Sequence, residues 1–168
     1  MKNSFLFLIV GLTLFGLNTI FAIEAESPGG YGGVGGPLIK VTSIKGETLV
    51  GIGGIGYGVL DRFLIGGMGV VLHKNQDYIM GYGGMYVGYK AFDSSAISVI
   101  PSMVLGYGTY FSQIRDTSFI LVEPGVEIHV KWSPYVESSL GLSYRLAGSD
   151  ADLSGGSVTC GIQFGFVK

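Results

Sequence analysis

The stretch SFILVEPGVEIHVKW, residues 118–132, alternates between two kinds of side chain from Val122 to Trp132. Successive side chains of a β-strand point to opposite faces, so this alternation predicts a strand with two unlike faces. The first face is apolar and carries Ile120, Val122, Val126, Ile128, Val130 and Trp132, with Pro124 among them. The second face is small or charged and carries Glu123, Gly125, Glu127, His129 and Lys131.

Two further segments, 135–147 and 156–167, repeat this pattern. A soluble barrel would turn the apolar face inward, whereas a membrane barrel turns it outward to lipid, and alternation alone fits both. The glycines of these segments fall on the polar face. Small residues suit the interior of an eight-stranded barrel, which is just wide enough for side chains. We therefore expect a polar interior and an apolar exterior.

The rest of the chain divides into apolar segments separated by turn residues such as Lys45-Gly46, Asp61-Arg62 and Ser133-Pro134. This spacing predicts an all-β fold, an eight-stranded antiparallel up-and-down (meander) β-barrel of transmembrane type. Closure of the sheet removes the exposed edges that such apolar strands would otherwise present. The expected strands are residues 38–44, 47–60, 63–73, 77–90, 96–111, 118–132, 135–147 and 156–167.

The amino-terminal part has the pattern of a secretion signal. In residues 1–22, Lys2 precedes an apolar run that ends at Ala22, so we expect a signal peptide there. A flexible, glycine-rich lead-in is expected over 23–36 and the barrel domain over 37–168. An uncleaved membrane anchor is the alternative, although the apolar run is shorter than the roughly 20 residues a spanning helix needs.

Composition narrows the choice of function. The 168 residues include 30 Gly but only 13% charged residues, which is too apolar for a disordered chain. Removal of residues 1–22 takes Lys2 away and leaves 9 Lys and Arg against 12 Asp and Glu, a net charge of −3. No basic patch remains, so we expect no nucleic-acid partner. Cys160 is the single cysteine and cannot form an internal disulfide.

The charges within the last strands suggest a structural cluster. If Ser133-Pro134 forms a tight turn, Glu123 and Arg145 lie opposite each other on the inner face, and we expect an ion pair there, joined by Glu127 and Lys131. The alternative is that these charges solvate an outer face. Trp132 is expected at the membrane interface. Segments 47–60 and 63–73 are apolar or Gly on both faces, so half of the interior should be dry, filled by Met68, Val70 and Leu72 or their neighbours, which argues against a channel.

Other motifs carry less weight. Residues 51–56, GIGGIG, match a dinucleotide-binding fingerprint, with Asp77 beyond it, but the required helix does not follow. We read them as close packing and expect no cofactor. Metal binding needs three or four converging ligands, so we expect a hydrogen-bonded His129 and no metal site. An enzyme would need His129 to meet Ser139, Ser143 or Ser157 and a carboxylate. No spacing identifies a nucleophile, so we expect no catalytic residues.

With the signal, the eight strands and the polar-in pattern, the chain resembles the small eight-stranded outer-membrane barrels of Gram-negative bacteria, the class of outer membrane proteins A and X. Its end, Phe164 to Lys168, places the last aromatic two residues before the terminus, whereas that class often ends on an aromatic. This resemblance is one of architecture. From the residue pattern we expect an integral outer-membrane protein of structural or interaction type in the lipid bilayer, without catalysis or an open pore. The alternatives are a soluble periplasmic or secreted barrel for a hydrophobic ligand and, third, an outer-membrane lipid-modifying enzyme that uses His129.

Overall fold

The computed structural model describes residues 31–44, 46–74, 78–112, 116–148 and 153–167, and most of these residues are in β-strands. Within that part of the chain, no helix is long and apolar enough to cross a membrane. The strands are β1 (Tyr31–Ile44), β2 (Glu47–Leu60), β3 (Phe63–Lys74), β4 (Tyr78–Tyr89), β5 (Phe92–Asp93), β6 (Ile97–Ser112), β7 (Asp116–Ser133), β8 (Val136–Ala147) and β9 (Gly155–Val167).

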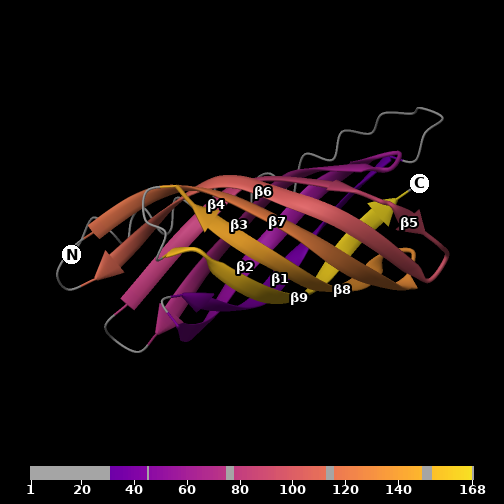
Figure 1. Ribbon diagram of the computed structural model, residues 1–168. Coiled ribbons are helices and arrows are strands. Elements are labelled where there is room, and N and C mark those ends of the chain that lie inside the picture. Colours follow the sequence, from indigo (N-terminus) through magenta and orange to yellow (C-terminus); the bar gives the residue numbers. More distant parts are fainter. Residues whose placement is uncertain (1–30, 45, 75–77, 113–115, 149–152, 168) are drawn as a thin grey trace.

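The strands form one closed antiparallel meander. Each long strand pairs with its neighbour in the chain, β1 also pairs with β9, and the pairing of β4 with β6 leaves no gap in the cylinder. The two-residue β5 pairs only with β6. Figure 1 shows the long strands winding obliquely around the barrel. The expected eight-stranded up-and-down β-barrel is therefore confirmed.

Strand boundaries agree with expectation to within a residue or two except at β1. This strand begins at Tyr31, and its first residues pair with both neighbours, as in Gly35 opposite Gly56 on β2 and Phe164 on β9. The expected lead-in 23–36 therefore differs from the structure over 31–36, because Gly32, Gly33 and Gly35 pair with both β2 and β9. Residues 1–22 and 23–30, including the expected signal peptide, lie outside the described residues.

The connections between strands lie at two ends of the barrel, which we call the proximal end and the distal end. The proximal end holds the start of β1, the end of β9, the turns 61–62 and 134–135, and the connection that contains β5. The distal end holds the connections 45–46, 75–77, 113–115 and 148–154. Asp61 has φ 57°, a left-handed conformation that Asp tolerates better than most residues. An even number of long strands brings the first and last strand ends together at the proximal end.

The faces of the barrel are inverted relative to a soluble protein. Trp132 is 72% exposed and Ile52 71%, whereas Lys40 is 1% and Glu123 2% exposed. The apolar face predicted for 118–132 is thus the outer face, and its charged face lines the lumen. Met68, Val70 and Leu72, the side chains expected to fill the apolar part of the interior, are buried and lie on the inner face of β3.

Glycines allow the strands to close around so narrow an interior. A Cβ at Gly53 would overlap the carbonyl oxygen of Gly69, and one at Gly84 would overlap that of Leu105. Both positions face inward. At the outward-facing Gly58 the nearest atom would be 3.8 Å away, an ordinary contact. The inner glycines are therefore required by space, which explains much of the high glycine content.

Candidate functional site

Polar side chains gather in the lumen, on the inner faces of β1 and of β6 to β9. Alternation along these strands directs every second residue inward. Burial of unpaired charges is costly, so the partners of each buried charge decide whether the interior is stable. The polar residues that are at least nine-tenths buried are Lys40, Thr42, Lys90, Ser98, Glu123, His129, Arg145, Ser157 and Gln163.

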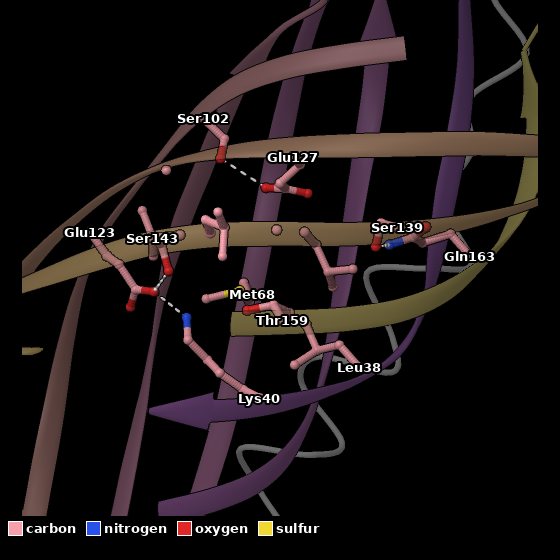
Figure 2. Close-up of a pocket in the computed structure, with 15 residues that line it drawn as sticks. Leu38, Lys40, Met68, Ser102, Glu123, Glu127, Ser139, Ser143, Thr159 and Gln163 are labelled. Atoms are coloured by element: carbon pink, nitrogen blue, oxygen red, sulfur yellow. Dashed lines mark hydrogen bonds and ion pairs between the residues drawn. The ribbon is translucent and has the colours of Figure 1, made fainter. Parts of the chain in front are cut away.

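Glu123 is the centre of the first group, which we call the upper network (Figure 2). Its Oε1 forms an ion pair with the Lys40 Nζ, across the lumen from β1. The same oxygen accepts a hydrogen bond from Ser143 Oγ at 2.5 Å, and Oε2 accepts one from the Tyr82 hydroxyl at 3.0 Å. The Lys40 ammonium also lies 5.6 Å from the centre of the Tyr82 ring, a cation–π distance. Side chains from three other strands, β1, β4 and β8, thus contact one carboxylate on β7.

Arg145 belongs to the same network but differs from expectation. The β7–β8 register does bring it opposite Glu123, yet the ion pair of Glu123 is made with Lys40. The fully buried Arg145 instead donates from Nε to the Leu153 carbonyl at 2.9 Å and from Nη2 to Thr42 Oγ1 at 3.3 Å. Its guanidinium carbon is 5.3 Å from the Tyr82 ring centre. The side chain therefore extends toward the distal end rather than across the hairpin.

His129 is the centre of a second group, which we call the lower network. Its Nε2 lies 3.1 Å from Glu127 Oε2 and its Nδ1 lies 3.0 Å from Glu137 Oε1. Tyr57 donates to Glu137 at 2.7 Å, and Ser102 donates to Glu127 at 2.8 Å. Because an ionised carboxylate only accepts hydrogen bonds, both ring nitrogens must donate. The geometry therefore fits a protonated imidazolium between two carboxylates.

Lys131 lies apart from both networks, at the proximal end. Its Nζ contacts Asp93 Oδ1 at 2.5 Å and the Ser94 carbonyl at 2.9 Å, and Ser98 Oγ donates to the same Asp93 oxygen at 2.5 Å. Partial burial acts to raise the pKa of Asp93, but the hydrogen bonds from Lys131 and Ser98 outweigh it and hold this pKa below its usual range. Asp93 lies in the connection outside the long strands. The four predicted charges are thus distributed over three groups.

The distal part of the lumen is apolar. Leu153, from the β8–β9 connection, is fully buried and closes over the upper network together with residues of five strands. We call this group the distal plug. Its members are Ile44, Leu49, Leu72, Met80, Phe119, Leu121 and Leu153.

The catalytic and cofactor motifs find no support in the geometry. Residues 51–56 lie within strand β2 and open no helix, so the dinucleotide fingerprint has no phosphate-binding terminus. Ser139 faces His129 across the β7–β8 ladder, but carboxylates occupy both ring nitrogens. Among the described residues, no group of three or more His, Cys, Asp or Glu is placed to hold a metal ion.

Sequence reasoning missed several members of these networks. The predicted charge cluster does not include Lys40, and it omits the polar partners Tyr57, Tyr82 and Gln163. The alternation of β1 places Lys40 inward, a signal that was available. Its choice of partner was not readable, because 83 residues separate it from Glu123 and only closure of the barrel brings them together.

A closed eight-stranded meander with a polar lumen and an apolar exterior is the architecture of small outer-membrane barrels. Among solved structures, the chain is similar to the attachment invasion locus protein Ail of Yersinia pestis, with TM-score 0.57 and 13% identity over 82% of this chain and 99% of that one. It is also similar to Neisserial surface protein A, with TM-score 0.55 and 11% identity over 80% and 96% of the two chains. No protein-family model and no curated protein sequence matches. The expected architectural resemblance is confirmed.

Proposed function

We propose that the chain is an integral outer-membrane β-barrel of structural or interaction type, exported by the leader 1–22, with its proximal end toward the periplasm. The observation that carries this proposal is the inversion of the barrel. Large apolar side chains such as Ile39, Leu142 and Ile162 are half exposed or more, while charged side chains are buried. In water such a surface would drive association, whereas in a bilayer it is the expected lipid contact.

Exposed aromatic side chains support the same orientation. Outer-membrane barrels carry aromatic girdles at both interfaces, where amphipathic rings meet the headgroups. Toward the distal end, Tyr107, Phe111 and Tyr144 are exposed. The aromatics exposed at or near the proximal end are Phe63, Tyr89, Phe92, Trp132, Tyr135, Phe164 and Phe166.

The structure also supports the proposal that the barrel has no open pore and no catalytic activity. The distal plug blocks the lumen, and the pairing of both His129 nitrogens with carboxylates leaves neither free to activate a serine. The distal connections comprise two to seven residues, from 45–46 to 148–154, so they offer little surface for a large ligand. These features support a mainly structural protein whose partner is the lipid bilayer.

The alternative, a soluble barrel around a hydrophobic ligand, requires the opposite facing. It would turn Trp132, Tyr144 and Phe164 inward, but all three are more than half exposed. Its proposed cavity lining, the inner faces of β2 to β4, is filled by residues such as Met68 and Tyr86. The lumen is therefore too full for a lipid-sized ligand, which needs a pocket of roughly 300 Å³ or more.

Membrane fractionation tests the proposal. The protein should remain in the outer-membrane fraction after carbonate extraction, and it should migrate differently on a denaturing gel before and after heating, as closed barrels do. A Gly84→Val variant, whose side chain cannot fit the barrel wall, serves as the control and should lose the heat-dependent shift. Release of the wild-type protein as a soluble species from washed membranes would contradict membrane integration.

A further inference from the structure

The two polar networks are separated by a small cavity near the middle of the lumen (Figure 2). Among the described residues, no hydrogen bond joins the Glu123 group to the Glu127 group. Yet members of both line the same space: Lys40 and Glu123 from the upper network, Glu127 and Ser102 from the lower. The cavity has a volume of about 30 Å³. Its lining therefore combines charged groups with apolar side chains such as Leu38, Ile55 and Met68.

Gln163 provides a second, independent observation. This side chain is 1% exposed and lines the cavity. Its Nε2 donates to Ser139 Oγ at 2.8 Å, but its Oε1 has no hydrogen-bond partner among the described residues. Buried polar atoms are hydrogen-bonded in most proteins, to protein groups or to ordered water. An unpaired acceptor beside a polar cavity thus points to a ligand that can donate a hydrogen bond.

The size and chemistry of the cavity identify that ligand. A buried water needs about 10–15 Å³ on the same measure and two to four polar partners, so the space suits about two waters. Gln163 Oε1 and the carboxylates accept hydrogen bonds, while the Lys40 ammonium donates one. A cation is disfavoured, because Lys40 already neutralises Glu123 and His129 lies against Glu127.

We propose that this cavity is a binding site for ordered water, which donates to Gln163 Oε1 and links Glu127 to the Lys40–Glu123 pair. The water joins the upper and lower networks into one hydrogen-bonded network on the proximal side of the distal plug. Charges from β1, β7 and β8 then act as one unit, although within the described part of the chain no hydrogen bond joins the two networks directly. The inference is independent of the membrane location, because it rests only on the interior.

Nuclear magnetic resonance on the isotope-labelled, detergent-solubilised full barrel tests this site. The side-chain amide protons of Gln163, assigned by their loss in Gln163→Leu, should show cross-relaxation with long-lived water. A Ser139→Ala variant is the control, because it removes the neighbouring hydroxyl, whose exchange with solvent could mimic the signal. The cross-peak should persist in that variant.

Two results would overturn the water site. The first is resolved Gln163 amide resonances without cross-relaxation to water in the wild-type barrel and in Ser139→Ala, which would mean a dry cavity. The second is a shift of these resonances when sodium replaces potassium at constant ionic strength, which would mean a bound cation. A heat-dependent gel shift for each variant verifies that its barrel is closed before the spectra are compared.

Discussion

At the scale of single residues, Glu123 finds its ion-pair partner across the lumen, whereas His129 finds its carboxylate partners within one hairpin. The sequence was sufficient to place Glu123 and Arg145 on the same face of one hairpin, but their register comes from a turn at 134–135 and a register shift between Lys131 and Ser133. It was not sufficient to pair Glu123 with Lys40, since β1 and β7 are distant in sequence and do not pair in the sheet. By contrast, the hydrogen bonds of the buried His129 are local, to Glu127 on the same strand and to Glu137 on the other strand of the β7–β8 hairpin.

Removal of one partner from the Lys40–Glu123 pair should be costly. Lys40→Met leaves a buried carboxylate without its cation, and we expect a loss of about 3–5 kcal/mol in the free energy of unfolding. The measurement is reversible urea unfolding in detergent or lipid, followed by loss of the folded gel band. Lys131→Met, at the more exposed Asp93 pair, is the matched control and should lose less than about 1 kcal/mol. Equal losses in the two variants would refute the central role of Glu123.

We expect the contribution of Asp93 to the stability of the barrel to be lost in acid. Its folded-state pKa is lowered, so its contribution to stability is complete above the unfolded value of about 4 and is lost as pH falls through the lower folded value. We expect Asp93→Asn to reduce stability at pH 7 and to remove this part of the decline below pH 4. Urea midpoints between pH 2 and 7 measure it. Parallel curves for variant and wild type would contradict this assignment.

At the scale of elements, most strand boundaries were predictable because turn residues mark them. Asp61-Arg62 and Lys45-Gly46 separate long apolar segments, and the strands end there. The start of β1 was not predictable, since its repeated glycines have the composition of a linker and only pairing with β2 and β9 orders them. The two-residue β5 lacks any periodic signal. A run of glycines can therefore indicate either a flexible linker or a strand in a narrow barrel wall.

Substitutions at two glycines on β4 test whether the inner glycines are required by space. A Cβ at the inward Gly84 would overlap the backbone of β6, whereas a Cβ at the outward Gly81 meets no described atom within 4 Å. Gly84→Ala should therefore lower the yield of refolded barrel several-fold. Gly81→Ala should leave the yield unchanged, because the added methyl group has open space. Refolding into lipid vesicles, scored by the heat-dependent gel shift, gives both yields, and similar yields would contradict the space argument.

At the scale of the whole molecule, the inversion of polar and apolar faces is the feature that unites the observations. The prediction from the last three strands extends to the middle strands, whose outer residues Ile52, Ile65 and Met85 are exposed. Their facing could not be read from the sequence, because glycine and aliphatic residues occur on both faces. Closure of the sheet determines which residues of the middle strands face inward, because the lumen is narrow and must hold both the inner glycines and the side chains of the distal plug.

Because the lumen is closed, we expect the protein not to conduct ions across a membrane. Reconstituted in planar lipid bilayers, the wild-type barrel should give no stepwise conductance, because the apolar side chains of the distal plug occupy the lumen. Replacement of Leu72 and Leu121 by Ser would hydrate the plug and should raise ion leakage above the wild-type level. A well-defined open-channel conductance of the wild-type protein would contradict this account of the interior.

The single tryptophan gives the most direct test of the inverted barrel. Trp132 lies on the outer face near the proximal end, so in reconstituted vesicles its fluorescence should be quenched by lipids that carry a quencher near the headgroup, and only weakly by aqueous iodide. The same measurement on protein unfolded in urea should reverse this preference. Strong quenching of the folded protein by iodide without quenching by lipid would contradict the proposed membrane orientation.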